Sequence, residues 1–273
     1  MVAFPPCKIN LGLHVLNKRP DGYHNIETCF APVPWTDILE IIPSDQFTFT
    51  SSGNIIPGDG RDNLCIMAYY LLKDDFSLPA VNIHLHKIIP TGAGLGGGSS
   101  DAAHTLLLLN EIFSLKLTTL QLERYAGMIG SDCPFFIHNM AMFGSGRGEV
   151  MEPVQDLDLN SMFLVLVKPD VHVSTQEAYA GIVPQVPVVS LRSVLGTYPV
   201  AEWKDVLVND FEYSVSRKHP VIRSIKEKFY KEGAVYASMS GSGSSVFGIF
   251  SSPVNLKDQF PGCEYWQGSL MNK

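Results

Sequence analysis

The clearest signal along the chain is a strict alternation of apolar and polar positions in two short segments. In residues 80–86, Val81, Ile83 and Leu85 alternate with an asparagine and two histidines. Residues 9–16 alternate in the same way between apolar side chains and small or polar ones. Successive side chains of a strand point to opposite faces of a sheet, so this period of two predicts two half-buried strands.

Other segments are assigned from shorter apolar runs, helical spacing and turn residues. A hairpin turn is expected at 17–23, and strands at 38–42 and 47–50 continue the antiparallel pattern after it. Residues 141–151 are expected to form two strands around a glycine turn, and single strands are expected at 162–167, 235–239 and 245–250. Helices are expected at 63–72, at 99–113 with serine caps, at 117–129, at 175–180, around residue 190 and at 221–232. This mixed order, with an antiparallel beginning, predicts an α+β fold.

A polar stretch at 156–160, followed by a new apolar strand, marks the expected boundary between two subdomains. The chain has 273 residues, which is enough for roughly two domains of about 150 residues each. We therefore expect subdomains at 1–157 and 158–273.

Composition narrows the classes of function. Hydrophobic residues make up 45% of the chain and charged residues 17%, which indicates an ordinary globular core. The 20 basic and 27 acidic residues give a net charge of −7, which argues against a broad nucleic-acid surface. The longest apolar run, 162–167, is far shorter than the ~18 residues that a membrane-spanning helix needs.

The cysteines and the N-terminal residues indicate the cellular compartment of the protein. The five cysteines lie far apart and include no C-x-x-C pair, which favours reduced thiols over a disulfide framework or a zinc site. Lys8 places a charge where a signal peptide would have its apolar stretch. We therefore expect a cytoplasmic protein with no membrane and no nucleic-acid partner.

The strongest chemical signal is the segment P-T-G-A-G-L-G-G-G-S-S at 90–100, here called the glycine-rich loop. It lies between a predicted strand and a predicted helix. Glycines let the backbone approach a ligand, and successive N–H groups before a helix bind anions, so the loop predicts phosphate binding. No G-K-[ST] closes it as in a Walker A loop, and neither H-R-D nor D-F-G of the protein kinases occurs.

A dinucleotide site is a weaker alternative for the same loop. The spacing G-x-G-x-x-G at 92–97 fits its fingerprint. That fold requires a second strand ending in an acidic residue about 20 residues later, but the corresponding segment, 117–129, has a helical pattern.

Four other features are weighed between a structural and a functional interpretation. The C-terminal glycine loop, residues 239–245, is either a tight turn or a second anion-binding nest, whereas the structural interpretation, a hairpin turn, is favoured for 144–148. Asp132, between Gly130 and a proline, is favoured locally as a helix cap or turn former but could also accept a proton. Lys8 alone reads as a solvated charge at a strand edge.

Taken together, three segments resemble the motifs of the GHMP small-molecule kinases. They are C-K-I-N-L at 7–11, the glycine-rich loop, and S-M-S-G-S-G at 238–243. A closer resemblance, to the branch that phosphorylates a cytidine-diphosphate-linked methylerythritol in the non-mevalonate isoprenoid route, rests on four more segments: G-L-G-G-G-S-S-D-A-A at 94–103, R-P-D-G-Y-H at 19–24, G-S-D-C-P-F at 130–135 and V-S-T-Q-E-A-Y at 173–179.

The resemblance implies a fold and a reaction. The fold would be the two-subdomain GHMP kinase fold of the α+β class, with a mixed α/β nucleotide-binding N-terminal subdomain, a ferredoxin-like C-terminal subdomain and the active site in the cleft between them. The reaction would be ATP-dependent phosphorylation of the substrate's 2-hydroxyl. Mg²⁺ is expected with ATP, but the resemblance identifies no protein ligand for it.

It also implies residue roles. Lys8 and Asp132 would be the catalytic pair. The ATP-binding residues would be Pro90, Thr91, Gly92, Ala93, Gly94, Leu95, Gly96, Gly97, Gly98, Ser99 and Ser100, with Asn63 and Lys87 near the nucleotide. The substrate-binding residues would be Asn10, Tyr23, His24, Thr175 and Tyr179, and an additional glycine loop would contain Gly241, Ser242 and Gly243.

Three positions depart from the common pattern of that branch. Cys7 stands where alanine is commoner, and Tyr179 where phenylalanine is common. Asp101 stands where many relatives carry asparagine beside the phosphates, so it could either repel them or help to hold Mg²⁺.

Three other functions are weighed against this one. A GHMP kinase for mevalonate or homoserine would have no use for the base-stacking aromatic in R-P-D-G-Y-H. A nucleotide-binding protein without activity would not need both Lys8 and Asp132. A Rossmann dehydrogenase is the third alternative.

Overall fold

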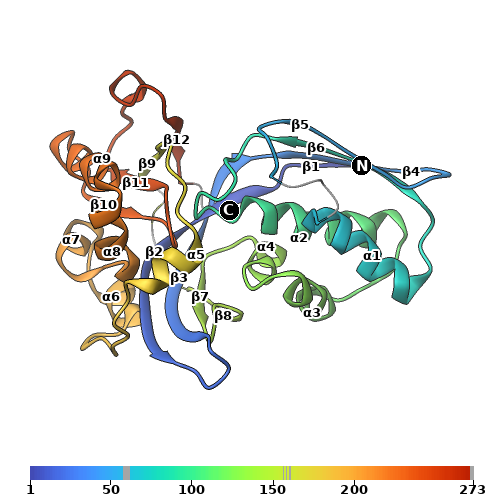
Figure 1. Cartoon of the computed structure of the whole chain (residues 1–273), viewed down its shortest axis with the longest axis horizontal. Coiled ribbons are helices and arrows are strands. Elements are labelled where there is room, and N and C mark those ends of the chain that lie inside the picture. The colour runs from blue at the N-terminus through green and yellow to red at the C-terminus, as the bar shows by residue number, and fades with distance from the viewer. Residues whose placement is uncertain (58–61, 156, 158, 160, 271–273) are drawn as a thin grey trace. The chain divides into compact units, whose positions relative to one another are not determined.

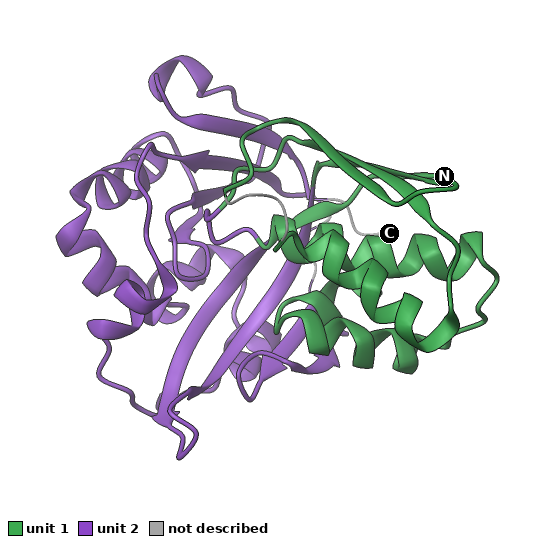
Figure 2. Cartoon of the chain, turned by 45° about the vertical axis from the view of Figure 1, so that its right-hand side comes forward, with its two compact units in different colours: residues 1–7, 35–91, 96–140 green, residues 8–34, 92–95, 141–273 purple. Residues whose placement is uncertain are grey.

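The computed structural model describes residues 1–57, 62–155, 157, 159 and 161–270. Its chain forms two compact units, distinguished by colour in Figure 2. Unit 1 contains residues 1–7, 35–91 and 96–140, and unit 2 contains residues 8–34, 92–95 and 141–273. The expected boundary at residues 157 and 158 adjoins residues 156, 158 and 160, which lie outside the described residues, so it stays a prediction.

Unit 1 is a four-stranded sheet with helices on one face (Figure 1). The strand order is β1 (Val2–Ala3), β4 (Ile38–Pro43), β6 (Val81–Lys87) and β5 (Thr48–Gly53). The helices are α1 (Leu64–Phe76), α2 (Gly97–Ile112), α3 (Thr119–Ile129) and α4 (Cys133–His138). The apolar side chains of β6 are buried and join Leu39, Leu72 and Leu106 in one core, as the alternation at 80–86 predicts.

One expected pairing in this sheet is wrong. Residues 48–53 form a strand, but β5 runs parallel to β6, with Phe49 opposite Ile83, and does not continue the antiparallel pattern. Parallel neighbours need a crossover connection, and α1 provides it between β5 and β6. The unit thereby contains a β–α–β element just before the glycine-rich loop.

Unit 2 holds two further four-stranded sheets. One has the order β2 (Pro6–Lys18), β3 (His24–Thr36), β7 (Met142–Ser145) and β8 (Val150–Pro153), where β2 and β3 extend beyond the unit's bounds by a few residues. The other has the order β10 (Tyr236–Met239), β11 (Val246–Phe250), β9 (Phe163–Lys168) and β12 (Glu264–Ser269). Its neighbouring strands are all antiparallel, and its order in chain terms is second, third, first, fourth. This is the ferredoxin-like arrangement that was expected.

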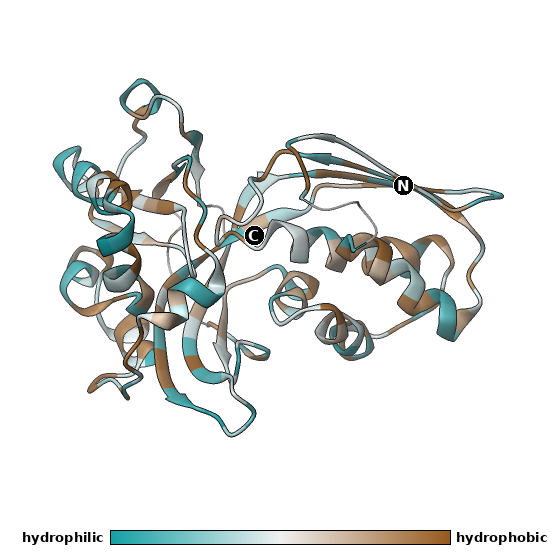
Figure 3. Cartoon of the chain, in the orientation of Figure 1, coloured by the Kyte–Doolittle hydropathy of each residue, from teal (hydrophilic) through white to brown (hydrophobic). Residues whose placement is uncertain are grey.

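The helices of unit 2 lie mostly between β9 and β10 in the sequence. They are α5 (Thr175–Ala180), α6 (Leu191–Thr197), the short 3₁₀ helix η1 (Val200–Glu202), α7 (Trp203–Val206), α8 (Asp210–Lys218) and α9 (Pro220–Lys231), and a second 3₁₀ helix, η2 (Lys257–Gln259), precedes β12. Hydrophilic and hydrophobic positions alternate around α9 (Figure 3), and its Ile222, Ile225 and Phe229 are buried. This spacing of three and four residues places one apolar stripe on the core.

The start of α2 differs from the expectation. The helix begins at Gly97, and its N-cap is Gly96, with φ of 68° and no capping side chain, so the predicted serine caps are wrong. A left-handed backbone conformation favours glycine over serine, which explains why the helix starts within the glycine run. No helix in the described ranges has the length and apolar character needed to cross a bilayer.

Candidate active site

In unit 2 the glycine-rich loop is tied to the C-terminal glycine loop. Gly94 has φ of 74°, and a Cβ atom there would collide with the Ser240 carbonyl oxygen. The Gly94 carbonyl accepts a hydrogen bond from the Ser240 hydroxyl at 2.9 Å, and Ser245 N–H donates to the Ala93 carbonyl at 3.1 Å. Only glycine permits this close approach of two backbones.

Lys8 lies where these two loops meet. It is 4% exposed on β2, so its interpretation as a solvated strand-edge charge is wrong. Its ammonium donates to the Asn10 side-chain oxygen at 2.6 Å and to the Gly94 carbonyl at 3.1 Å, and a Cβ atom on Gly241 would lie 3.4 Å from Lys8 Nζ. Removing an ammonium from water is costly, so its burial here indicates a site built around the charge.

Asn10 has a fixed orientation. Its amide nitrogen donates to the Thr28 hydroxyl at 2.9 Å, and that hydroxyl donates to the Gly12 carbonyl at 2.7 Å. The amide oxygen is therefore the atom that faces Lys8. The series of hydrogen bonds from Gly12 through Thr28 and Asn10 to Lys8 holds the ammonium in one direction.

A second clamp holds the C-terminal glycine loop. Asn209, 4% exposed at the N-terminus of α8, donates from its amide to the carbonyls of Met239 and Gly241, both at 2.8 Å. Its side-chain oxygen accepts from Phe211 N–H and so caps α8. The sequence analysis missed both Asn209 and α8, although N-D-F-E, an N-cap followed by acidic residues, is a signal of a helix start.

The α2 end of the glycine-rich loop belongs to unit 1. The first-turn N–H groups of α2 have no partners within the helix, and its dipole favours an anion there. Gly97 approaches Lys87 closely, because a Cβ atom on Gly97 would lie 2.9 Å from Lys87 Nζ. The loop thus leads directly to a buried charged cluster.

That cluster consists of Asp37, Lys87 and Asp101, each at most 2% exposed. The Lys87 ammonium donates to Asp37 and, at 2.9 Å, to Asp101 Oδ2. Asp37 also accepts backbone N–H bonds from Ile88 and Ile89. Asp37 was missed by the sequence analysis, and no local pattern identifies it.

The charges in the cluster are unequal, with two carboxyls against one ammonium. Burial raises the pKa of Asp101 to about 7, since Lys87 offsets the burial only in part and Asp37 adds to it. Burial alone would lower the pKa of Lys87, but Asp101 and Asp37 together raise it above its ordinary value. Asp101 is therefore engaged with Lys87, and its Oδ1 atom has no hydrogen-bond partner among the described residues.

A cavity of about 140 Å³ in unit 1 is lined by this cluster and by the glycine-rich loop. Its walls include Asn63, Lys87, Thr91, Gly98 and Asp101 among other residues. Apolar side chains from Leu64 and Leu85 complete it. The cavity brings together Asn63 and Lys87, which the sequence analysis places near a nucleotide.

Asp132 stands at the N-cap position of α4, but its carboxylate makes no capping hydrogen bond to that helix. The local expectation of a helix cap or turn former is thus right in position, since Asp132 lies in a turn and at the N-cap, although its side chain makes no capping hydrogen bond. Gly130 ends α3 two residues earlier, and Pro134 follows in the first turn of α4, so the backbone on both sides is constrained. The half-buried carboxylate is held in place without serving the helix.

Aromatic side chains from distant parts of unit 2 form a second group. The rings of His24 and Tyr179 stack, with centroids 4.9 Å apart and an angle of 20°. Tyr23 is 57% exposed, and the Arg147 guanidinium lies 4.8 Å from its ring centroid. Thr175 is exposed at the start of α5.

Arg147 is another residue that the sequence analysis missed. It lies in the glycine turn at 144–148, which was interpreted only as a hairpin turn. An arginine inside such a turn is the signal that could have identified it.

Two family models match the chain: the GHMP kinases N terminal domain over residues 63–140 and the GHMP kinases C terminal model over residues 202–261. The chain is 53% identical, over 252 residues, to a protein of Cytophaga hutchinsonii named 4-diphosphocytidyl-2-C-methyl-D-erythritol kinase, covering 92% of this chain and 93% of that one. It is 52% identical to a protein of the same name from Parabacteroides distasonis, covering 99% and 100%.

Solved structures agree with these matches. A crystal structure of 4-(cytidine 5'-diphospho)-2C-methyl-D-erythritol kinase is 32% identical to the chain, with a TM-score of 0.75 over 91% of this chain and 90% of that one. The mevalonate kinase of Methanococcus jannaschii, 12% identical with a TM-score of 0.71 over 100% and 98%, shares the fold. The GHMP fold and the kinase class expected from the sequence are thereby confirmed, and the chain belongs to the GHMP kinase family, among its 4-diphosphocytidyl-2-C-methyl-D-erythritol kinases.

Proposed function

We propose that this chain transfers the γ-phosphoryl group of ATP to the 2-hydroxyl of 4-diphosphocytidyl-2-C-methyl-D-erythritol, in the non-mevalonate route to isopentenyl diphosphate. The observation that carries the proposal is the buried Lys8 ammonium, held by Asn10 and by the carbonyl of Gly94 within the glycine-rich loop. Phosphoryl transfer depends mainly on positioning and charge neutralisation, and a fixed cation beside a phosphate-binding loop supplies both.

ATP would bind along the glycine-rich loop. Residues 90–100 would cradle its phosphates through backbone N–H groups and the first turn of α2. The cavity with Asn63 and Lys87 would take the base, since its apolar walls suit a flat ring and its polar groups suit the ring edge.

Magnesium would enter as part of the substrate, MgATP. Within the described ranges no cluster of three or more histidine, cysteine, aspartate or glutamate residues is placed to hold a metal ion. Mg²⁺ is commonly held by substrate phosphates and water with only one or two carboxylates from the protein. We therefore assign no side chain of this chain as a metal ligand.

Lys8 and Asp132 would share the chemistry. Asp132 would accept the proton from the attacking 2-hydroxyl, and its freedom from helix capping suits that role. Lys8 would stabilise the charge that develops on the attacking oxygen and the transferred group. The C-terminal glycine loop, through Gly241, Ser242 and Gly243, would exclude water from the Lys8 ammonium and hold it in position.

The cytidine end of the substrate would use the aromatic group of unit 2. Tyr23 offers an exposed ring face for the base, and the stacked pair of His24 and Tyr179 offers a second surface. Asn10 and Thr175 would reach the polar groups of the substrate. A kinase for mevalonate or homoserine would need no such platform.

A cytoplasmic location is part of the proposal. None of the five cysteines forms a disulfide, and four of them are buried. Burial raises the pKa of the Cys29 thiol far above its ordinary value, so this group stays an inert thiol. Reduced thiols are typical of a reducing compartment.

One assay tests the proposed function. ADP release is measured with MgATP and, in separate reactions, 4-diphosphocytidyl-2-C-methyl-D-erythritol, mevalonate, homoserine or methylerythritol without the nucleotide. We expect turnover with the cytidylylated substrate only. Turnover with mevalonate or homoserine, or none with any acceptor, would refute the proposal.

A further inference from the structure

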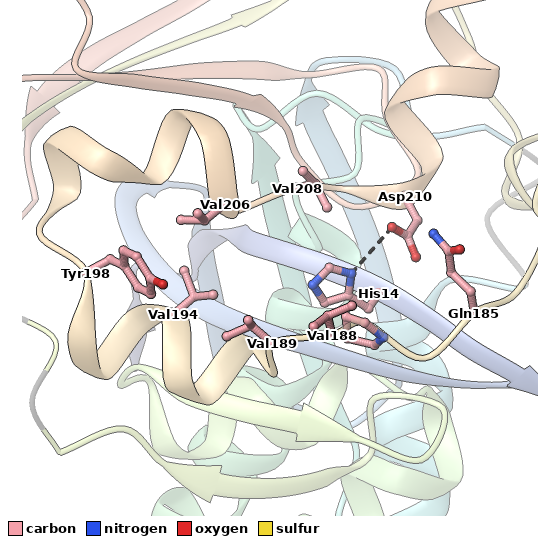
Figure 4. Close-up of a pocket in the computed structure, with 10 residues that line it drawn as sticks. His14, Gln185, Val188, Val189, Val194, Tyr198, Val206, Val208 and Asp210 are labelled. Atoms are coloured by element: carbon pink, nitrogen blue, oxygen red, sulfur yellow. Dashed lines mark ion pairs between the residues drawn. The ribbon is translucent and has the colours of Figure 1, made fainter.

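Unit 2 contains a cavity of about 270 Å³ that none of the proposed kinase residues lines (Figure 4). Its walls come from β2, the segment 185–189, α6 and the segment 206–210. Five of the ten lining residues are valines, and Tyr198, the C-cap residue of α6, also lines the cavity. This is the volume of about nine waters at ~30 Å³ each, which is room for a compact organic molecule.

The polar end of the cavity is a histidine–aspartate pair. His14 is 6% exposed, and its Nδ1 atom lies 3.4 Å from Asp210 Oδ1 (Figure 4). The other oxygen of Asp210 accepts the Val15 N–H at 2.7 Å. Both carboxylate oxygens thus have a polar neighbour, and in neutral His14 the tautomer with its proton on Nδ1 is the one that directs an N–H toward Asp210.

The second ring nitrogen of His14 is directed toward the valine side of the cavity (Figure 4). Among the described residues it has no hydrogen-bond partner. With the proton on Nδ1, Nε2 carries a lone pair and accepts a hydrogen bond. An acceptor that faces an apolar cavity can take a hydrogen bond from the donor group of a ligand there, in place of water.

The surrounding charge selects the kind of donor. Among the described residues that line the cavity, none is a lysine or an arginine, and Asp210 carries the only carboxylate. An anionic ligand would therefore face a carboxylate with no lysine or arginine to balance it. An uncharged hydroxyl group can donate to Nε2 while its apolar body packs against the valines.

We propose that this cavity binds an uncharged alcohol or phenol with a compact apolar body, and that its occupancy alters catalysis. The route to the proposed catalytic residues is short. Asp210 directly follows Asn209, whose amide holds the carbonyls of Met239 and Gly241. Gly241 packs against Lys8 and Asn10.

A ligand held at His14 and Asp210 is thus one residue from the clamp on the C-terminal glycine loop. Its binding restrains the first turn of α8 and hence the two carbonyls that Asn209 holds. The effect on catalysis is expected in kcat, because the loop supports Lys8 and no residue of the nucleotide cavity lines this second cavity.

Binding is measured on the full chain by NMR titration of ¹³C-labelled valine methyl groups. Phenol, toluene and benzoate serve as probes of similar size that differ in the polar group. Phenol is expected to shift the methyls of Val188 and Val194 saturably and to bind about fivefold more tightly than toluene, which lacks the hydrogen bond. Benzoate is expected not to bind. Equal affinity for phenol and toluene, or tighter binding of benzoate, would overturn the assignment.

Three variants locate the site. Val188→Trp places a larger ring at the open side of the cavity, because Val188 lines the cavity and its own side chain is fully exposed, so the variant should block phenol binding without loss of folding. Val183→Trp is the matched control, because Val183 is 85% exposed and lines no part of this cavity. His14→Asn keeps a donor near Asp210 and removes Nε2, so phenol should then bind no better than toluene. Loss of binding in Val183→Trp, or full binding in Val188→Trp, would exclude the cavity as the site.

The catalytic half of the proposal has its own readout. In the ADP-release assay, saturating phenol should change kcat by at least about twofold in the parent and in Val183→Trp, and should leave kcat of Val188→Trp unchanged. Saturated binding with an unchanged kcat in the parent would refute this half.

Discussion

The Lys8 ammonium donates a hydrogen bond of 2.6 Å to the side-chain oxygen of Asn10, two positions along the same strand. Side chains two residues apart on a strand share a face, so K-x-N on β2 presents a cation and an oriented amide together. The Thr28 hydroxyl prevents the amide from turning over. The direction of the Lys8 ammonium is therefore fixed by hydrogen bonds to neighbouring residues of the sheet.

Replacing Lys8 by methionine should separate catalysis from stability. Methionine keeps the length of the side chain and removes the charge, so the free energy of unfolding should stay within about 1 kcal/mol or rise, because burial of an ammonium is costly. Turnover should fall by at least about a hundredfold. Lys18→Met, at the exposed end of the same strand, is the control for both measurements. A variant that loses stability and keeps turnover would give Lys8 a structural role.

Asp132→Asn tests the proposed base. Asparagine keeps the size and shape of the side chain and removes only its charge, so the melting temperature should change little. Turnover should fall by about a hundredfold or more, while the affinity for ATP, measured by calorimetry, should stay close to that of the parent. Asp74→Asn, an exposed position on α1, is the control. Wild-type turnover in Asp132→Asn would remove the assigned base.

Local patterns predicted most of the elements, because most strands and longer helices show the full repeat of apolar residues that is typical of their secondary structure. They missed β1, α4, α7, α8 and β12, which are short or lack a clear apolar repeat, and they gave no bounds for β3, although the hairpin turn at 17–23 implied a second strand. The parallel pairing of β5 was missed because pairing partners depend on which strands the crossover helix brings together. The spacing of apolar residues in β5 does not specify which strand pairs with it.

The candidate site also has parts that local sequence predicts and parts that it does not. The glycine-rich loop is visible in the sequence because Gly92, Gly94 and Gly96 each have a positive φ, a local requirement that favours glycine. The burial of Lys8 and the hydrogen bonds of Asn209 depend on segments that lie far apart in the chain, so the residues near them in sequence give no sign of either. For Lys8, only the resemblance of several motifs to a kinase family indicated the role.

Asp101→Asn should flatten the dependence of stability on pH. The pKa of this carboxyl is raised from an ordinary value near 3.8 to about 7 by burial, with Lys87 and Asp37 as its charged neighbours. Between these two pH values the folded state holds a proton that the unfolded state has lost, so the free energy of unfolding falls as pH rises and levels off above pH 7. Below pH 3.8 both states are protonated, and the group has no effect on the slope.

Asparagine stays neutral throughout, and the pair of Lys87 with Asp37 remains. Relative to the parent, the variant should therefore gain up to about 4 kcal/mol between pH 4 and pH 8, at ~1.4 kcal/mol for each pH unit over which the parent loses stability. Urea unfolding at pH 4, 6 and 8 measures this difference. Parallel curves for the two proteins would show that Asp101 is already ionised in the folded state at pH 4.

Asn209→Asp isolates the clamp on the C-terminal glycine loop. A carboxylate still accepts the Phe211 N–H and caps α8, but it has no N–H groups to donate to Met239 and Gly241. Loss of two buried hydrogen bonds should lower the free energy of unfolding by about 2–4 kcal/mol and reduce kcat, since Gly241 packs against Lys8. Asn255→Asp, at an exposed position, is the control. An unchanged kcat would mean that Lys8 does not depend on this loop.

Tyr179→Ala should weaken binding of one substrate and leave the other unchanged. The Tyr179 ring stacks on His24 and packs edge-on against Phe211, so its removal takes away half of the proposed platform for the cytosine ring. An aromatic contact of this kind contributes about 1 kcal/mol beyond its buried area, so KM for the cytidylylated substrate should rise by at least about fivefold.

KM for ATP should stay the same, because Tyr179 does not line the nucleotide cavity. Tyr213→Ala on α8 removes a tyrosine that is 73% exposed and serves as the matched control. Steady-state ADP release with each substrate varied in turn separates the two constants. An equal rise in both KM values would indicate a general loss of structure and would refute a specific role of Tyr179 in binding the cytidine end.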